Sequence, residues 1–350
     1  MEKPIIGITT GDINGIGPEI IIKALSDNRI LDLCTPIVFS SNKVINYYRR
    51  IAVDHQLVFN STKEMDKLNP KQVNVFNCWE EEVSIQPGVL TEAGGKYAVR
   101  SLQVATQCLK DGQLDALVTG PIHKSNAQSP NFPFSGHTPF LKDKFEAKDV
   151  LMLLYHKDLR VAVATEHIPL EKVAASITTE LLQSKLTLLR DSLIKDFGID
   201  KPRIAVLGLN PHAGDEGTIG NQEQSIIKPV LEQWQQTGHL VYGPYSADAF
   251  FAKGNYKNFD GILAMYHDQG LIPFKTLANG EGVNFTAGLP IVRTSPDHGT
   301  AFDIAGKNLA DHSSFLEAVF QAIELVRQRE SYAEYTSNPL RRRRMEKERD

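Results

Sequence analysis

Several features that would point to common classes of protein are scarce or missing from this 350-residue chain. It has three cysteines, Cys34, Cys78 and Cys108, far apart and without a CxxC pair, which argues against a disulfide framework or a cysteine-type zinc site. The apolar run near the N-terminus is too short for a secretory signal, and no later run approaches a membrane span. We therefore expect a cytoplasmic protein.

A large excess of charge of one sign is also missing. The formal net charge is −4, which gives no global attraction to nucleic acid or to a membrane surface. The one basic block, RRRR at 341–344, lies in a charged C-terminal tail, and we assign it no role in nucleic-acid binding.

Strand-like and helix-like patterns alternate along the chain, which predicts a largely parallel sheet with helices on its faces. The region 43–90 is weakly patterned, with 74–79 as its best strand candidate. The sequence predicts strands over 4–10, 36–41, 115–120, 150–156, 160–168, 203–212 and 262–266. It predicts helices from Pro18 and over 92–110, 180–197, 226–236 and 313–328.

Polar chemistry is concentrated between short apolar runs in residues 261–305. The run ILAMY reads as a buried strand that ends at His267 and Asp268; LIPFK then brings in Lys275, and GLPIVRTS places Arg293 at a strand end. The glycines and hydroxyls of PDHGTAFDIAG follow. Such groups at strand ends beside a glycine-rich turn are typical of the active sites of α/β enzymes, here for an anionic substrate.

Three histidines follow apolar strands: His167, His212 and His267. Strand ends of an open α/β sheet converge on one edge, so the three imidazoles can meet as a catalytic divalent-metal site. Separate hydrogen-bonded histidines remain the alternative interpretation.

Two turns complete the set of motifs. GDINGIGPE after the first strand lacks the third glycine of a dinucleotide-binding fingerprint, and no acid follows the second strand, so a tight turn with helix capping is at least as good an interpretation. The turn SGHTPF offers Ser135, His137 and Thr138 to a small polar ligand.

Together these segments resemble the 4-hydroxythreonine-4-phosphate dehydrogenase family of vitamin B6 biosynthesis. The matching segments run in order from about residue 4 to residue 330: TTGDINGIGPEI, VTGPIHK, FSGHTPFL, ATEHIP, GLNPHAGDEGTIG, MYHDQGLIPFK and VNFTAGLPIVRTSPDHGTAFDIAGK. The last segment also resembles the loop by which isocitrate and isopropylmalate dehydrogenases hold the adenine half of their cofactor.

The resemblance implies roles for individual residues. It implies a metal site formed by His167, His212 and His267, with zinc, magnesium or cobalt as the ion. Further residues match substrate-binding positions: His137, Thr138, Lys275, Asn284 and Arg293. By analogy with the wider superfamily, cofactor contacts are expected from Ser295, Asp297, Gly299, Thr300 and Asp303. Lys275, Asp268 and a metal-bound water remain alternative acceptors of the substrate's proton.

The reaction that the resemblance implies is the oxidation of 4-phosphooxy-L-threonine by NAD or NADP. The resulting β-keto acid loses carbon dioxide and gives 3-amino-2-oxopropyl phosphate. Pro139 stands where many members have an acid, so related substrates stay open: erythronate or threonate 4-phosphate, or aromatic dihydrodiols. An acyl-phosphate transferase and a non-enzymatic metal- or ligand-binding protein are weaker alternatives.

The implied fold is of the isocitrate/isopropylmalate dehydrogenase type, with two α/β subdomains and a cleft between them. We predict one subdomain from 1–124 with 286–335, the other from 125–285, and a tail at 336–350. The resemblance also implies a homodimer with its active site at the interface, where His167 and His212 come from one chain and His267 from the other.

Overall fold

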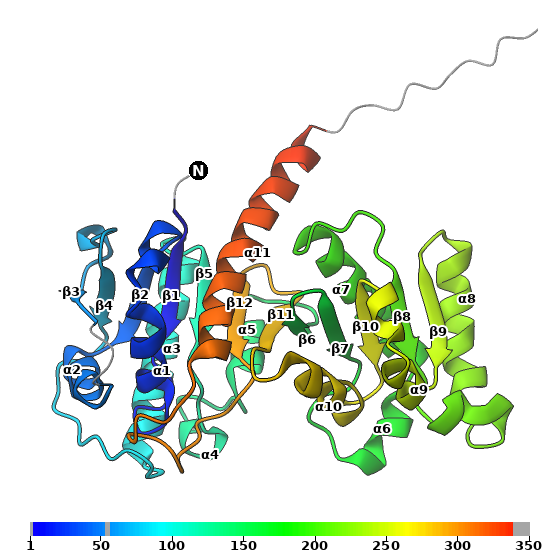
Figure 1. The fold of residues 1–350 in the computed structure, drawn as a ribbon, viewed down its shortest axis with the longest axis horizontal. Helices are drawn as coiled ribbons and strands as arrows, with labels where there is room; N and C mark the ends of the chain where they lie inside the picture. Colours follow the sequence, from blue (N-terminus) through cyan, green and yellow to red (C-terminus); the bar gives the residue numbers. More distant parts are fainter. Residues whose placement is uncertain (1–2, 53–56, 339–350) are drawn as a thin grey trace, which may run out of the picture.

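A twelve-stranded mixed sheet forms the centre of the computed structural model, which describes residues 3–52 and 57–338 (Figure 1). The strand order is β3-β4-β2-β1-β5-β12-β11-β6-β7-β10-β8-β9. The strands are β1 (Ile5–Thr9), β2 (Thr35–Ser40), β3 (Phe59–Thr62), β4 (Val73–Asn77), β5 (Ala116–Thr119), β6 (Leu151–His156), β7 (Leu159–Val163), β8 (Ile204–Leu207), β9 (Val241–Tyr245), β10 (Gly261–Ala264), β11 (Val283–Ala287) and β12 (Val292–Pro296).

The sheet consists of two parallel groups that run in opposite directions. The strands from β3 to β12 are parallel to one another, and so are β7, β10, β8 and β9. Between the groups, β12, β11, β6 and β7 are joined by antiparallel pairings. The antiparallel centre is where the functional residues from the two halves of the sheet come together.

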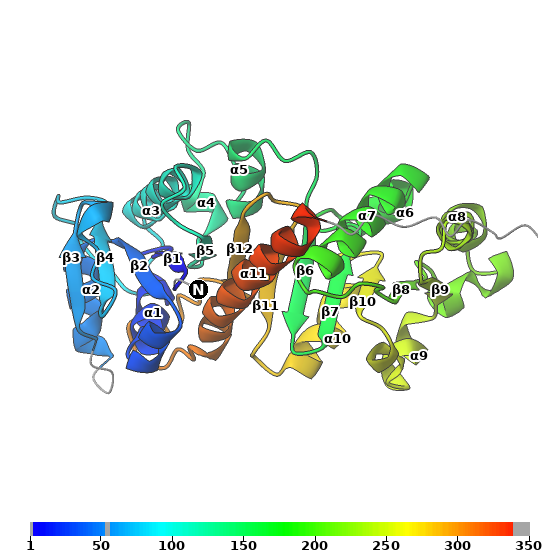
Figure 2. The same ribbon diagram turned by 90° about the horizontal axis from the view of Figure 1, so that it is seen from above.

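Helices flank both faces of the sheet (Figure 2). They are α1 (Gly17–Leu25), α2 (Asn42–Ile51), α3 (Glu92–Lys110), α4 (Lys124–Ala127), α5 (His137–Lys144), α6 (Leu170–Ser176), α7 (Thr179–Lys195), α8 (Lys228–Gln236), α9 (Ala247–Ala252), α10 (His267–Ala278) and α11 (Ser313–Ser337). The long helix α11 packs on β12, β11 and β5 at the middle of the sheet. None of the helices in the described region of the chain is long and apolar enough to span a membrane.

Burial explains the apolar strand runs. Every residue of β2, β5, β8, β10 and β12 is buried, as expected for strands covered by helices on both faces. Helix α10 lies close to β7 and β10 because Gly270 faces them; a Cβ at this position would be 3.0 Å from Ala264 and 3.1 Å from Val161 and Val163. This close packing fixes the helix that begins at His267.

The predicted class, an α/β fold with a large, mostly parallel sheet, is confirmed, and so are most of its elements. Among the details that differ are one helix and the positions of two site residues. Residues 42–51 form α2, because Ser41 caps the helix and Val44, Ile45 and Tyr48 bury one face of it, whereas the sequence suggested no element there. Lys275 lies on helix α10 rather than at a strand end, and Arg293 lies near the start of β12 rather than at its end.

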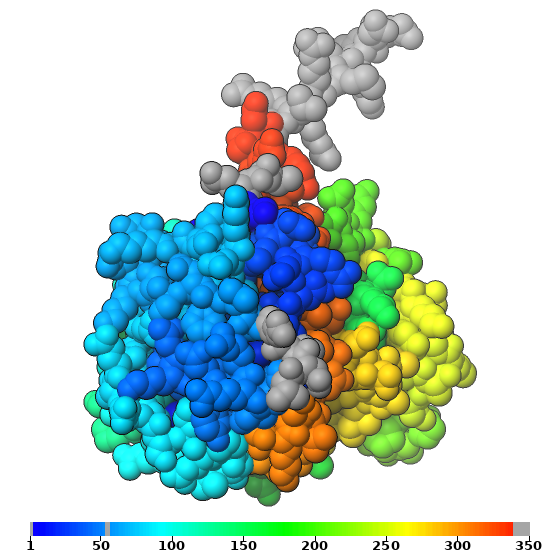
Figure 3. Space-filling view, turned by 60° about the vertical axis from the view of Figure 1, so that its left-hand side comes forward, coloured from blue at the N-terminus to red at the C-terminus, as the bar shows by residue number. Residues whose placement is uncertain are grey.

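The predicted subdomain division stays a prediction, since one sheet runs through both subdomains. Residues 1–124 with 286–335 contain β1 to β5 and β12, and residues 125–285 contain β6 to β10 and most of β11. In Figure 3 the orange segment, around residues 290–310, lies between the blue and cyan N-terminal region and the yellow and green region. The arginine block 341–344 lies outside the described residues.

Candidate active site

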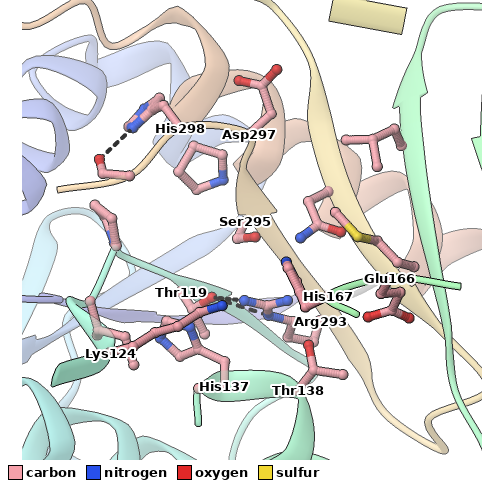
Figure 4. Close-up of a pocket in the computed structure, with 18 of the residues that line it drawn as sticks. Thr119, Lys124, His137, Thr138, Glu166, His167, Arg293, Ser295, Asp297 and His298 are labelled. Atoms are coloured by element: carbon pink, nitrogen blue, oxygen red, sulfur yellow. Dashed lines mark hydrogen bonds between the residues drawn. The ribbon is translucent and has the colours of Figure 1, made fainter. Parts of the chain in front are cut away.

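A cavity of about 490 Å³ opens beside the antiparallel centre of the sheet (Figure 4). Its walls come from the ends of β5 and β7, the first turn of α5, segments of β6, β11 and β12, helix α10 and the loop after β12. The predicted residues that line it are Ser135, His137, Thr138, His167, Lys275, Asn284, Arg293, Ser295, Asp297 and Gly299. All five predicted substrate-binding residues therefore share one cavity, although 156 positions separate the first from the last in the chain.

Arg293 is the most unusual residue of the cavity. Its side chain leaves β12 and donates hydrogen bonds to Thr119 Oγ1 from Nε at 3.1 Å and Nη2 at 2.6 Å, and to Thr286 Oγ1 from Nη1 at 3.1 Å. The residue is only 3% exposed, and no carboxylate of the described chain forms an ion pair with it. Burial lowers the pKa of its guanidinium to about 10. A buried cation without an acidic partner is costly unless an anion completes the site.

Three further polar atoms of the cavity residues are buried and lack a hydrogen-bond partner: His137 Nε2, Asn284 Oδ1 and His298 Nε2. Burial, followed by the charge of Arg293, lowers the pKa of His137 well below its usual value, so this imidazole is neutral. Because buried polar groups nearly always have partners, these three atoms are suited to a bound ligand. In Figure 4 His137 and Thr138 lie on the same side of the cavity as Arg293.

Lys275 and Asp268 are the side chains for which the sequence suggested a role in proton transfer. The Lys275 ammonium donates a hydrogen bond of 2.7 Å to the Asp297 carbonyl and lies 3.9 Å from the Asp297 carboxylate, at the edge of the cavity. Asp268 does not line the cavity; its side chain is 70% exposed and contacts His267 Nδ1 at 2.7 Å. Of the two, only Lys275 is placed to touch a ligand in the cavity.

The three candidate metal ligands are only partly brought together. The rings of His167 and His267 lie 5.5 Å apart, because their strands β7 and β10 are parallel neighbours. Burial, then the charges of Lys124 and His267, lower the pKa of His167, which favours the neutral imidazole that binds metals. His212 follows β8 within Pro211–Gly217, and residues 3–52 and 57–338 contain no group of three His, Cys, Asp or Glu side chains that could hold an ion.

The contact between the His167 and His267 rings concerns the expected metal site between two subunits. It is His267, not His212, whose ring lies beside that of His167 in the same chain. The division that the resemblance implied, with His167 and His212 from one chain and His267 from the other, stays a prediction.

The loop after β12 lies against the N-terminal turn. The Ile16 N–H donates to the Thr300 carbonyl at 3.0 Å, and a Cβ on Gly15 would come within 2.9 Å of that oxygen. The turn GDINGIGPE therefore supports this loop and leads into α1; the tight turn is confirmed, but no side chain caps the helix. Thr300 is buried and Asp303 is exposed, and neither lines the cavity, whereas Ser295, Asp297 and Gly299 line it.

Three charged residues of the cavity were not among the predicted site residues: Lys124, Lys142 and Glu166. Lys124 follows β5 in the segment TGPIHK, and Glu166 directly precedes His167, so both follow strands that the sequence had identified. Burial raises the pKa of the Glu166 carboxyl, while the charge of Lys185 and the Met152 N–H oppose that rise. The cavity thus combines four cationic side chains with two carboxylates.

An enzyme that binds a small, multiply charged anion is the class that this fold and cavity define. The chain belongs to the family described as pyridoxal phosphate biosynthetic protein PdxA, whose model matches residues 32–322. It is 48% identical over 346 residues to the 4-hydroxythreonine-4-phosphate dehydrogenase of Bacteroides thetaiotaomicron, covering 99% of this chain and 95% of that protein. A protein of Oceanobacillus iheyensis, provisionally named D-threonate 4-phosphate dehydrogenase, is 37% identical, with 93% and 98% covered.

Solved structures agree with this assignment. The 4-hydroxythreonine-4-phosphate dehydrogenase of Klebsiella pneumoniae superposes with a TM-score of 0.80 at 31% identity, covering 93% of this chain and 98% of that one. A terephthalate 1,2-cis-dihydrodiol dehydrogenase of Burkholderia xenovorans reaches a TM-score of 0.61 at 27% identity, with 92% and 98% covered. The resemblance drawn from the sequence motifs is confirmed.

Proposed function

We propose that this protein oxidises 4-phosphooxy-L-threonine with a nicotinamide dinucleotide, as a step in the synthesis of pyridoxal phosphate. The family and the names of relatives that match nearly the whole chain support the reaction. The observation that carries the proposal is Arg293, a buried cation without a carboxylate partner, in a cavity with the free atoms His137 Nε2 and Asn284 Oδ1. A substrate with a phosphate and a carboxylate supplies the anions that this cavity lacks.

Each side chain of the cavity has a defined task in this proposal. Arg293 grips one anionic group of the substrate in two-point fashion, and Lys275 at the cavity edge attracts the other. Asn284 Oδ1 accepts a hydrogen bond from a substrate hydroxyl or ammonium. Because His137 is neutral, its Nε2, which has no partner in the chain, forms a hydrogen bond with the ligand without adding charge. These contacts hold the secondary alcohol in one orientation, which is the main contribution that a protein makes to hydride transfer.

The dinucleotide, NAD or NADP, accepts the hydride when it is bound. Ser295, Asp297 and Gly299 line the cavity, and a Cβ on Gly299 would meet nothing within 4 Å, so the loop leaves open space there for a ligand. Thr300 and Asp303 belong to the same loop but do not line the cavity, so their contacts with the cofactor stay a prediction. The oxidised product is a β-keto acid, which loses carbon dioxide to give 3-amino-2-oxopropyl phosphate.

A divalent ion fits the chemistry of the histidines. Two imidazoles lie next to each other, and the neutral state favoured at His167 is the one that binds metals. Zinc is the ion best suited to three imidazoles, with magnesium or cobalt as alternatives. Such an ion would act as a Lewis acid toward the substrate alcohol. His167, His212 and His267 would hold it.

A second copy of the chain is the proposed source of the third histidine. Exposed apolar side chains lie near the two rings along the chain: Ile168 and Leu170 follow His167, and Ile272 lies on α10, five residues after His267. Leu170 is 73% exposed and Ile272 64% exposed. A homodimer would cover this surface and bring His212 of the other copy to the pair, whereas the resemblance implied that His267 comes from the other copy. Leu170→Asp and Ile272→Asp should each weaken association, measured by analytical ultracentrifugation, and lower metal content in parallel.

The reaction is tested by reduced-nicotinamide absorbance with purified protein. We expect turnover with 4-phosphooxy-L-threonine, with NAD and NADP compared directly, and release of carbon dioxide in equal amount. Threonate 4-phosphate and erythronate 4-phosphate are the second candidate substrates, favoured by the relative from Oceanobacillus iheyensis. A higher turnover efficiency with either sugar acid phosphate, or with an aromatic dihydrodiol, would overturn the proposal.

A further inference from the structure

His212, the proposed metal ligand that follows β8, lies on a strained turn. Residues 212–216 have φ between 44° and 81° in succession, and four of the five are not glycine: His212, Ala213, Asp215 and Glu216. Left-handed backbone is costly for residues that carry a Cβ, and it normally occurs at single positions rather than in a run. The surrounding structure must therefore hold this left-handed turn in place.

The buried carboxylate of Glu223 lies against the left-handed turn. The residue is 0% exposed; its Oε1 accepts the Asn210 N–H at 2.7 Å, and its Oε2 accepts from Asn210 Nδ2 at 2.9 Å. Two glycines leave room for it. A Cβ on Gly214 would lie 2.6 Å from Oε2, and a Cβ on Gly208 would lie 3.2 Å from Oε1 and 2.9 Å from the Ala213 Cα. The carboxylate thus binds the residue two positions before His212 and packs against the turn that follows.

Two features that cost folding energy therefore coincide here. Within residues 3–52 and 57–338, Glu223 forms no ion pair, and burying a carboxylate without a cation is unfavourable. The run of left-handed residues is the second cost, and features of this kind persist mainly at functional sites. The ring of His212 is exposed and forms no hydrogen bond within the described residues. Its position is therefore set by the backbone of the turn.

We propose that Glu223 is a positioning residue for the metal site, which holds the left-handed turn so that the His212 imidazole is in place before the ion binds. This inference rests on the proposed function, in which His212 is one of three ligands, and it applies whichever chain supplies the other two. Residues that orient a metal ligand without touching the ion typically change metal affinity by about tenfold to a hundredfold when they are replaced.

The test measures the dissociation constant for cobalt, from the visible absorbance of the bound ion in competition with a chelator. Glu223→Gln keeps the size of the side chain, but its NH2 group would face the two N–H donors of Asn210. We expect the dissociation constant to rise about tenfold or more. His212→Ala should also weaken cobalt binding. Adding Glu223→Gln to His212→Ala should change the constant by less than about twofold, because the turn then has no ligand to position.

Asp196→Asn is the matched control. Asp196, at the end of α7, is a buried carboxylate that accepts from the Ser192 hydroxyl at 2.7 Å and from Arg329 Nε at 2.6 Å. Its replacement should lower the midpoint of urea unfolding and leave the dissociation constant for cobalt at the wild-type value. If Glu223 were merely structural, Glu223→Gln would give this same pattern.

Wild-type cobalt affinity in Glu223→Gln, or an equal loss of affinity with and without His212, would overturn the inference. Should Glu223→Gln not fold, Asn210→Ala removes the Nδ2 donor and leaves the backbone donor. This variant should still raise the dissociation constant about threefold or more, on the scale of one hydrogen bond, and an unchanged constant would overturn the inference as well. If wild type binds no cobalt, or if His212→Ala binds it as tightly as wild type, the proposed metal site itself is refuted.

Discussion

Replacing Arg293 by methionine should separate function from stability. The variant removes the guanidinium and keeps a long, flexible apolar side chain in the buried space. If Arg293 binds an anionic group with two charged hydrogen bonds, the variant should lose about 3 kcal/mol of transition-state stabilisation. The value of kcat/KM should therefore fall roughly a hundredfold. The affinity for the dinucleotide, measured by fluorescence titration, should barely change.

The free energy of unfolding should respond in the opposite sense. Burying an unpaired charge costs several kcal/mol, and the variant no longer has that cost. It also loses the bonds to Thr119 and Thr286, which are worth about 1 kcal/mol each. The ligand-free variant should therefore be as stable as wild type or more stable in urea unfolding, as expected for a residue retained for binding rather than for folding.

Arg160→Met provides the matched control. This arginine lies over the rings of Tyr155 and Phe197 and donates to the carbonyls of Asp158 and Asp260, outside the cavity. Its loss should destabilise the fold by about 1–2 kcal/mol, in line with lost packing and hydrogen bonds, and leave KM unchanged. If Arg293→Met were destabilised like Arg160→Met while its KM stayed at the wild-type value, Arg293 would be structural and our reasoning refuted.

Three further predictions concern the metal, the loop after β12 and pH. Chelator treatment should abolish turnover, and added zinc or cobalt should restore some of it. Co-expressing His167→Ala with His212→Ala should recover up to about half the wild-type activity per heterodimer, because one of the two metal sites keeps all three ligands. Co-expressing His167→Ala with His267→Ala should recover none, because each site then lacks a ligand. The reverse pattern would place His212 and His167 in one chain. Gly15→Ala, whose Cβ would lie 2.9 Å from the Thr300 carbonyl, should raise the KM for the dinucleotide more than the KM for the substrate. If both KM values equal those of wild type, the loop after β12 does not contact the cofactor. The pKa of His137 is lowered from 6.5 in the folded chain, so below pH 6.5 the unfolded chain gains a proton that the folded one does not, and stability falls with falling pH. Urea unfolding should therefore show the advantage of wild type over His137→Asn shrinking from pH 7.5 to pH 5, and a constant difference would contradict a buried neutral imidazole.

Local sequence patterns were sufficient to predict secondary structure where the apolar residues follow a single period. The strand at β8 and the helix at α11 were predicted because their apolar spacing fits one structure only. The segment LIPFK was ambiguous, since a short apolar run fits a strand or a buried helix; Pro273 inside α10 made the helix harder to recognise. Helix α2 was missed because its buried face consists of Val44, Ile45 and Tyr48 among polar residues.

The sequence by itself determined the family, the α/β class and the residue types of the site, since these depend on motifs and periodicity that can be read along the chain. Which residues meet was decided by the order of the strands. The pairing of β11 with β12 places Asn284 opposite Ser295, and the pairing of β5 with β12 brings Thr119 to Arg293 across 174 positions. Only this arrangement revealed that Arg293 is buried without an acid, that Lys124 and Glu166 share its cavity, and that His267 lies beside His167. Contacts of this kind depend on strand order and burial. Because these are properties of the whole folded chain, no single segment of the sequence predicts them.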